Sequence, residues 1–165
     1  MSDLPTYPED AAEREAAMRA EGADRAYASW LSRVGAYLLD VLILALPLIV
    51  FFAIIFAVDP GDTSAAWGAV GLAYVASLVL PFLYFTVLHG NERGQTYGKR
   101  AAGIRVVDQR TGSSIGYGRA FGRYAIIVVF GLILLPLLLD YLWPLWDDKN
   151  QAWHDKVVGS VVVKA

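Results

Sequence analysis

Arg33 and Asp40 are the residues of this chain whose types and positions could support chemistry inside a membrane. They belong to a stretch from Trp30 to Val58 in which almost every side chain from Val34 onward is apolar. This run exceeds the roughly 20 apolar residues that a helix needs to cross a bilayer. An arginine at the entry of such a helix can reach the lipid headgroups. A carboxylate two turns deeper costs on the order of 3 kcal/mol, so Asp40 requires compensation.

The spacing of Arg33 and Asp40 argues against a direct ion pair between them. Seven positions put the two on nearly the same helix face, but roughly 10 Å apart along the axis. We therefore expect that Asp40 is protonated or finds a base from elsewhere in the chain. If Asp40 is a titratable site, the candidate counter-charges are Arg33, Lys99, Arg100 and Arg123.

Composition places the chain among membrane proteins. Of its 165 residues 56% are hydrophobic, and the mean hydropathy is +0.44, which is too apolar for an ordinary soluble domain. The net charge of −2 gives no support to nucleic-acid binding. The absence of cysteine excludes disulfides and thiolate catalysis. No nucleophile stands with a base and an orienting group, so we expect neither an enzyme nor a cofactor.

The apolar segments divide the chain into a tail and a membrane domain. Residues 1–28 are predicted to be a disordered acidic N-terminal tail, and residues 29–165 a transmembrane domain. A second span is expected from about Trp67 to Leu88. The connection before it holds Pro60 and Gly61 but no lysine or arginine, so the positive-inside bias puts this connection outside and the N-terminus in the cytoplasm.

The segment from His89 to Arg123 carries most of the basic charge and is expected to be cytoplasmic. Its basic residues are Arg93, Lys99, Arg100, Arg105, Arg110, Arg119 and Arg123. Lys99 and Arg100 should lie at headgroup level, able to bind anionic lipid or to reach a carboxylate between helices. Gly94 to Lys99 is one residue too short for a phosphate-binding loop of the GxxxxGK type, and we reject that reading.

The third apolar segment, residues 125–146, leaves two topologies open. A single crossing would put the C-terminus outside. However, the strand-like VVGSVVV near the C-terminus needs a partner, and the natural one is GIRVV in the basic loop. Pro136 near the middle would allow the segment to bend as a re-entrant hairpin buried against the other helices. We favour the re-entrant path, with a cytoplasmic C-terminus.

His154 and Asp155 form the remaining chemical candidate. Beside Asp147 and Asp148 they could suggest a metal site or an acid–base pair. Without further histidine or cysteine ligands, we expect a structural role and no metal. We expect Asp155 to dock onto the basic loop around Lys99 to Arg105.

Four features in order resemble the RDD family of small membrane proteins. They are Arg33 at a helix start, Asp40 within that helix, GQTYGKRAAGIRVVD, and AWHDKVVGSVVV near the end. The resemblance covers residues 28 to 163. The family is named for one arginine and two aspartates; Arg33 and Asp40 match the first two, and Asp155 is the best match for the third. The resemblance implies a role in transport, with cation/proton antiport proposed for some members of the family, or an accessory role in a membrane complex.

The sequence thus predicts an all-α membrane protein with three apolar helical segments, the third re-entrant, and a small cytoplasmic β element. The leading function is transport of a small cation or proton, with Asp40 as the titratable site. The alternative is a non-catalytic accessory or assembly subunit, in which Arg33, Asp40 and Asp155 form a buried ion-pair network. We expect a bacterial plasma-membrane protein that contacts the lipid bilayer and forms a homo-oligomer or joins a larger complex.

Overall fold

The structure, a computed structural model, describes residues 26–57 and 63–165. Residues 1–25 of the expected N-terminal tail lie outside the described residues. The described elements, in chain order, are α2 (Trp30–Ala57), α3 (Thr63–Gly90), α4 (Tyr97–Ala101), β1 (Ile104–Asp108), α5 (Gly116–Gly131), α6 (Leu134–Leu142), the 3-10 helix η1 (Trp143–Leu145), α7 (Trp153–Val158) and β2 (Ser160–Lys164).

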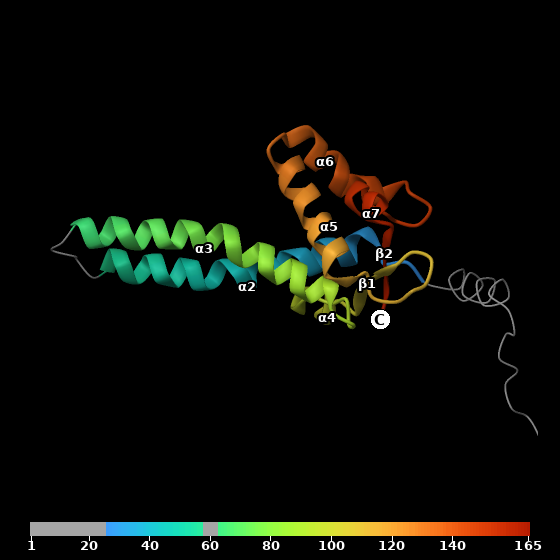
Figure 1. The fold of residues 1–165 in the computed structure, drawn as a ribbon, viewed down its shortest axis with the longest axis horizontal. Helices are drawn as coiled ribbons and strands as arrows, with labels where there is room; N and C mark the ends of the chain where they lie inside the picture. The colour runs from blue at the N-terminus through green and yellow to red at the C-terminus, as the bar shows by residue number, and fades with distance from the viewer. Residues whose placement is uncertain (1–25, 58–62) are drawn as a thin grey trace, which may run out of the picture.

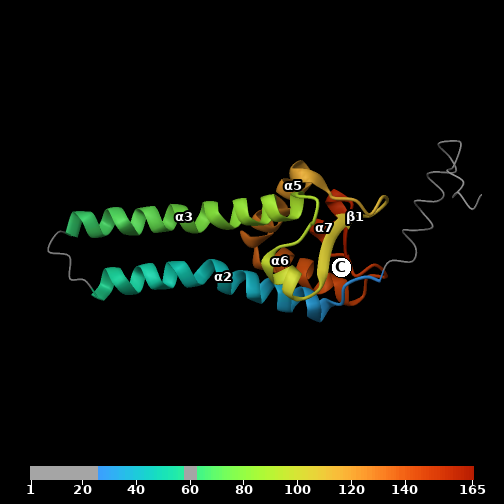
Figure 2. The same ribbon diagram turned by 90° about the horizontal axis from the view of Figure 1, so that it is seen from below.

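Two helices are long and apolar enough to cross a membrane, over Trp30–Ile55 and Trp67–Gly90. Each contains one proline, Pro47 in α2 and Pro81 in α3, and continues through it. The helices lie side by side, and the remaining elements gather at one end of the pair (Figures 1 and 2). The structure thus confirms the predicted fold in outline: it is mostly helical, with two long apolar helices, a shorter apolar helix and a small two-stranded sheet.

The sheet joins the basic loop to the C-terminus. β1 and β2 pair antiparallel, with Val106 opposite Val162 and Asp108 opposite Ser160. This is the pairing predicted between GIRVV and VVGSVVV. Gly159 ends α7 in the left-handed conformation (φ 64°) that glycine adopts most easily. The chain before α2 lies along the other edge of β2, where Ala28 donates its N–H to the carbonyl of Val162 at 2.9 Å.

The third apolar segment forms two helices, α5 and α6, and not one span. The helical structure is interrupted at Leu132 and Ile133, and Ile133 has an extended backbone (φ −130°, ψ 113°). Pro136, where the bend was expected, lies in the first turn of α6, where its missing N–H costs little. The hairpin nevertheless returns the chain to the sheet, as the re-entrant path requires (Figure 1).

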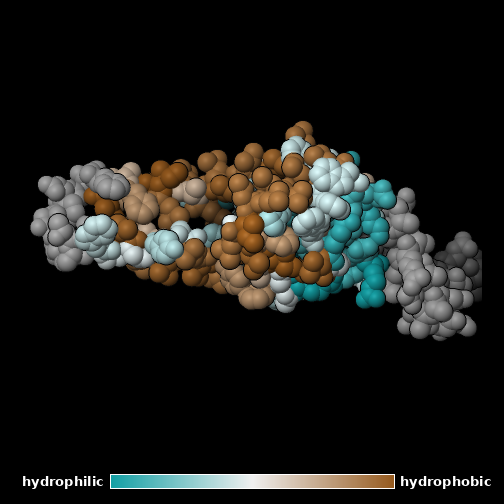
Figure 3. Space-filling model, turned by 90° about the horizontal axis from the view of Figure 1, so that it is seen from above, coloured by the Kyte–Doolittle hydropathy of each residue, from teal (hydrophilic) through white to brown (hydrophobic). Residues whose placement is uncertain are grey.

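The tip of this hairpin is not buried against the other helices, and this corrects the expectation. Leu132 is 81% exposed, and Leu134 and Leu135 are also exposed. Figure 1 shows α5 and α6 standing across the direction of α2 and α3, so the tip projects away from them. Figure 3 shows this apolar tip joined to the apolar surface of the long helices. Lipid is the environment that this surface fits.

The buried core is small and lies where the spans meet the sheet. Its larger cluster consists of Ala28, Ala36, Ile104, Val106, Ile115, Ala120 and Val162, and a second cluster consists of Val107, Val161 and Val163. These side chains come from α2 and the residues before it, from β1 and β2, and from α5 and the residue before it. The same region contains the buried charged residues.

Candidate functional site

Asp40 is fully buried, and its carboxylate accepts three hydrogen bonds. Oδ1 accepts from the hydroxyl of Tyr84 at 2.6 Å and from the N–H of Gly98 at 2.7 Å. Oδ2 accepts from the hydroxyl of Thr96 at 2.6 Å. Among the described residues no lysine or arginine forms an ion pair with Asp40. The compensation that we expected from a base therefore comes from hydrogen-bond donors.

Gly98 allows α4 to lie directly on α2. A Cβ at this position would stand 2.0 Å from the carbonyl oxygen of Ala36 and 2.8 Å from the carboxylate of Asp40. Thr96 is the N-cap of α4 and accepts from the N–H of Lys99 at 3.2 Å. The geometry makes Asp40 an anchor that holds the basic loop against the first span.

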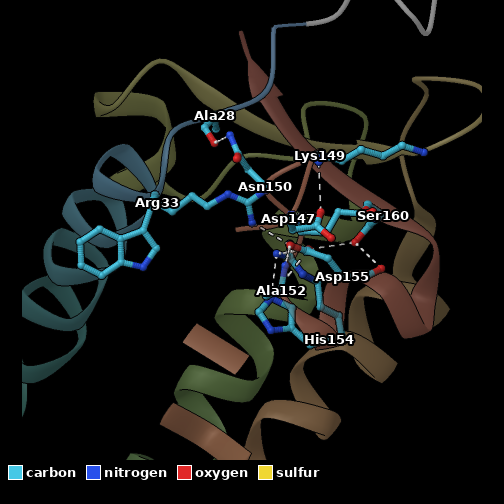
Figure 4. A network of polar contacts seen from close by, with 12 residues as sticks. Ala28, Arg33, Asp147, Lys149, Asn150, Ala152, His154, Asp155 and Ser160 are labelled. Atoms are coloured by element: carbon cyan, nitrogen blue, oxygen red, sulfur yellow. Dashed lines mark hydrogen bonds and ion pairs between the residues drawn. The ribbon is translucent and has the colours of Figure 1, made fainter. Parts of the chain in front are cut away.

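Asp155 lies at the centre of a second buried cluster (Figure 4). Arg33 Nη1 lies 2.7 Å from its Oδ2, and Arg123 Nη2 lies 2.6 Å from its Oδ1. The hydroxyl of Ser160 and the N–H of Ala152 also donate to the carboxylate, each at 3.1 Å. Burial alone would raise the pKa of Asp155, but the two guanidinium groups hold it well below its usual range.

His154 extends this cluster to a further carboxylate, Asp140. Its Nδ1 lies 2.6 Å from Asp140 Oδ2, and its backbone N–H donates to Oδ1 at 2.9 Å. Its Nε2 lies 3.0 Å from Nη2 of Arg123. Because a guanidinium can only donate, Nε2 accepts, and the imidazole proton belongs on Nδ1. His154 therefore links Asp140 to Arg123 through its two ring nitrogens.

The two arginines of this cluster keep unused hydrogen-bond donors. Nε and Nη2 of Arg33, and Nε and Nη1 of Arg123, are buried without a partner. Nε2 of His89 is buried without a partner as well. Leaving a buried charged donor unpaired is costly, so a cluster of such donors indicates a place for an acceptor.

Lys99 faces the same region, and its amine forms no ion pair with a described residue. Its side chain is 8% exposed. Burial and then the charge of Arg123 lower the pKa of Lys99 to about 7, although the charges of Asp40 and Asp155 oppose this. An anion beside this amine would restore its charged form.

A cavity of about 380 Å³ brings these cations together. Its polar lining comes from Arg33, Lys99, Arg123, His89 and His154. Its apolar and aromatic lining includes Trp30, Tyr37, Phe85, Tyr124, Ile127, Leu138 and Tyr141. No aspartate or glutamate among the described residues lines it. A cationic end with aromatic walls is suited to an anionic group that carries an apolar body.

The other basic residues of the loop have different surroundings. Arg100 and Arg105 are exposed, so Arg100 is not a buried counter-charge. Arg119 pairs with Asp108 and donates to the carbonyls of Val158 and Gly159, which ties α5 to the sheet. Burial raises the pKa of Asp108, but the hydrogen bond from Arg119 and two backbone N–H groups lower it to about 2.

The structure separates the three residues that the sequence analysis grouped. Arg33 and Asp155 are direct partners, while Asp40 has its own set of donors. Asp155 pairs with Arg33 of α2 and Arg123 of α5, and not with the loop around Lys99 to Arg105 where it was expected to dock.

Sequence reasoning missed the donors of Asp40 and the carboxylate of Asp140. Asp140 carried the same signal as Asp40, since it is a lone acid inside an apolar run. Tyr84 and Thr96 carried no such signal. Among the described residues no group of three histidines, cysteines, aspartates or glutamates could hold a metal ion.

Two bacterial proteins resemble this chain over more than half of its length. A protein called uncharacterized protein YckC, from Bacillus subtilis strain 168, is 33% identical over 141 residues, which is 82% of this chain and 83% of the relative. An uncharacterized protein of Haemophilus influenzae is 28% identical over 97 residues, covering 59% of this chain and 58% of the relative.

A shorter match joins this chain to part of a larger protein. The proline-rich antigen homolog of Mycobacterium tuberculosis strain H37Rv is 33% identical over 70 residues, which is 42% of this chain and 28% of the relative. No solved structure matches. The profile of the RDD family matches residues 27–159, which include Arg33, Asp40 and Asp155. The chain belongs to the RDD family.

Proposed function

We propose that this protein is a multi-pass membrane protein of the bacterial plasma membrane that binds an anionic group, in a transport-related role. The observation that carries the proposal is the set of unpaired, buried donors of Arg33 and Arg123 around one cavity, with Lys99 beside them. Guanidinium groups bind phosphate and carboxylate groups through several N–H bonds at once.

The carboxylates of the region do not cancel this preference. The region contains as many acidic as basic side chains: the carboxylates of Asp40, Asp140 and Asp155 match the basic groups of Arg33, Arg123 and Lys99. Each of the three carboxylates is already occupied by protein donors, and none lines the cavity. The groups left to meet a ligand are donors, so the cavity selects against a cation.

We place the sheet end of the molecule in the cytoplasm. The exposed arginines Arg93, Arg100, Arg105 and Arg110 belong to this end. The connection between α2 and α3, residues 58–62, contains no basic residue. This asymmetry follows the positive-inside bias.

Transport of a small cation or proton through Asp40 is the less favoured form of the proposal. A conducting carboxylate needs room for its cargo, whereas Asp40 is fully buried, accepts three hydrogen bonds, and lines neither the cationic cavity nor the cavity between α2 and α3. Its surroundings suit an anchor better than a carrier site.

An accessory or assembly subunit is the second candidate. The buried pairs of Asp155 with Arg33 and Arg123 favour it, because such pairs can serve to fix one arrangement of helices. Gentle purification from the native membrane separates the candidates. A stoichiometric complex with other proteins supports an accessory subunit, whereas a homo-oligomer supports the transport-related role.

Thermal unfolding tests anion binding. The protein in dodecyl maltoside is heated with added dodecyl phosphate or, as a zwitterionic control, dodecylphosphocholine, and its tryptophan fluorescence is followed. A ligand that binds only the folded state stabilises it by about 2.7 kcal/mol at 100 times its Kd. Selective stabilisation by dodecyl phosphate, reduced in Lys99→Gln but retained in Arg100→Gln, supports the proposal. Equal effects of both detergents on the wild type would overturn it.

A further inference from the structure

We propose that the ligand is an anionic phospholipid of the surrounding membrane, with its phosphate in the cationic cavity and an acyl chain between α2 and α3. This inference rests on the proposed anion binding and goes further by naming the class of ligand. It combines two neighbouring cavities of opposite character.

The phosphate end is the cavity lined by Arg33, Lys99 and Arg123. A phosphate offers several acceptor oxygens, and the unpaired arginine donors here come from two helices. They are Nε and Nη2 of Arg33 on α2, and Nε and Nη1 of Arg123 on α5. Nε2 of His89 on α3 is also buried without a partner, and it donates in one of the two imidazole tautomers. Lys99 of α4 adds a nearby amine that has no ion-pair partner among the described residues. Because Arg33, Arg123 and Lys99 all line this cavity, a phosphate, with acceptor oxygens pointing in several directions, suits it.

The chain end is a second cavity, of about 260 Å³, between α2 and α3. It shares Tyr37, Phe85 and Tyr124 with the cationic cavity, so the two adjoin. From there it extends along α2 to Leu48 and along α3 to Ala76, and its other lining is apolar except for Ser77. Figure 3 shows the surface hollowed between the two long helices.

The length of this groove matches one leaflet of a bilayer. Eleven residues separate Tyr37 from Leu48, which is roughly 16 Å along a helix. The hydrocarbon core of a bilayer is about 30 Å thick, so one leaflet accounts for about 15 Å of it. A ligand with its phosphate at Lys99 therefore has room for a chain that ends near the membrane midplane.

The lining also distinguishes a lipid from a free anion. Tyr37 is 39% exposed and Leu138 is 48% exposed, and both line the cationic cavity. The cavity is therefore bordered by exposed side chains on the surface that we expect to face lipid, so that a lipid could enter it from the membrane. A free phosphate would leave the aromatic walls uncovered, whereas a lipid covers them and fills the groove.

A transmembrane helix is the other occupant that the groove between α2 and α3 could receive. Ala45, Ala76 and Ser77 line it, and small side chains permit close helix approach. The cationic end argues for the lipid, because a helix crossing at the groove would leave the donors of Arg33 and Arg123 unpaired.

Native mass spectrometry tests the inference with two pairs of matched variants. The protein is delipidated in maltoside detergent and offered phosphatidylglycerol, phosphatidylcholine or inorganic phosphate. Lys99→Gln removes the free cation, and Arg100→Gln removes the exposed neighbouring charge. Leu138→Trp narrows the cationic cavity at Leu138, which lines it. Leu135→Trp places the same ring on the exposed face of α6, outside the cavity.

One retained phosphatidylglycerol per chain, and no retained phosphatidylcholine, is the expected result. Lys99→Gln should weaken retention about tenfold, the effect of losing one charge-assisted contact. Leu138→Trp should also weaken retention, because the larger ring takes up space that the lipid needs. Arg100→Gln and Leu135→Trp should retain lipid as the wild type does. If Lys99→Gln fails to fold, the comparison of Leu138→Trp with Leu135→Trp decides whether the lipid occupies the cavity.

Three results would overturn the inference in different ways. Inorganic phosphate that binds in Leu138→Trp and displaces phosphatidylglycerol from the wild type would identify a soluble anion, and the proposed anion binding would stand. A second protein chain in the groove, detected as a dimer that excludes lipid, would replace the lipid by a helix. No selective binding of phosphatidylglycerol, inorganic phosphate or dodecyl phosphate would remove both proposals.

Discussion

Arg33 and Asp155 form an ion pair of 2.7 Å although 122 positions separate them in the chain. Arg33 lies in the first turn of the first apolar helix, and Asp155 lies in the short helix α7 before the last strand. Their side chains are 12% and 0% exposed. The pair therefore fastens the start of the first span to the C-terminal part of the chain, with Arg123 as the second partner of Asp155.

Replacing Asp155 should destabilise the protein more than replacing the nearby aspartates Asp147 and Asp148. Asp155→Ala leaves two buried guanidinium groups without their carboxylate, which should cost about 3–5 kcal/mol. Asp147 pairs with Lys156, whose side chain is 43% exposed, so Asp147→Ala should cost less. Asp148→Ala, at an exposed position, should have the smallest effect. Chemical denaturation in detergent measures the order, and equal losses at all three positions would contradict it.

Asp40→Asn should release α4 from α2. The carboxylate accepts three hydrogen bonds, and an amide nitrogen in place of one oxygen would face a donor, so the loss should be about 2 kcal/mol or more. Gly98→Ala should act in the same way, because its Cβ would meet the carbonyl of Ala36. Hydrogen exchange should rise in Tyr97–Ala101 in both variants.

The helix α5 provides the control for the Asp40 prediction. A Cβ at Gly118 meets nothing within 4 Å, so Gly118→Ala should leave exchange in α4 unchanged. If Asp40→Asn keeps α4 protected and abolishes cation-dependent proton movement in vesicles, Asp40 is a transport site and not an anchor.

The C-terminus should lie on the same side of the membrane as the basic loop. β1 and β2 are paired, so Arg105 and Lys164 cannot lie on opposite sides. Because the protein has no cysteine, single cysteines at Ala165, Arg105 and Ser64 can be labelled with a membrane-impermeant thiol reagent. Ser64, at the opposite end of α3, should label in intact cells, and the other two only after lysis. Labelling of Ala165 before lysis would rule out a cytoplasmic sheet.

Lys99 should make the stability of the ligand-free protein depend on pH. Its pKa falls from an ordinary 10.5 to about 7 because it is buried, with Arg123 and Arg33 lowering the pKa and Asp40 and Asp155 opposing them. Between these values the unfolded chain binds the extra proton, so stability should rise with pH from about 7 to 10.5. The whole effect is on the order of a few kcal/mol.

Comparison with a matched variant isolates the Lys99 contribution. Lys99→Gln should flatten this rise, since glutamine keeps much of the side chain without the charge. Arg100→Gln, one position away and exposed, should keep the wild-type profile. A rise of the same size in Lys99→Gln would show that another group causes it.

The parts of the fold that follow local rules could be predicted from the sequence. The spans follow from their apolar length, and the pairing of β1 with β2 followed from two short β-branched runs that each needed a partner. The bend of the third segment was misplaced, because Pro136 is tolerated in a first helical turn and the break occurs at Leu132 and Ile133.

The partners within the site depend on packing, which the sequence does not display. Asp40 was correctly identified as a residue that needs compensation, but the choice of Tyr84 and Thr96 over a base depends on how α4 lies on α2. In the sequence Arg123 is one of several basic residues in the loop, and only the structure shows that α5 orients it toward Asp155. The cavity is lined by residues of eight separate elements, and no local sequence pattern predicts it.

The affinity of the cavity for a phosphate-bearing amphiphile tests the central claim most directly. Dodecyl phosphate is titrated into wild type, Lys99→Gln and Arg100→Gln in maltoside detergent at pH 6.5, and the heat is recorded. We predict saturable binding to one site per chain, weakened about tenfold or more in Lys99→Gln and unchanged in Arg100→Gln. Absence of saturable binding to the wild type, or equal weakening in the two variants, would contradict the assignment of the cavity as an anion site.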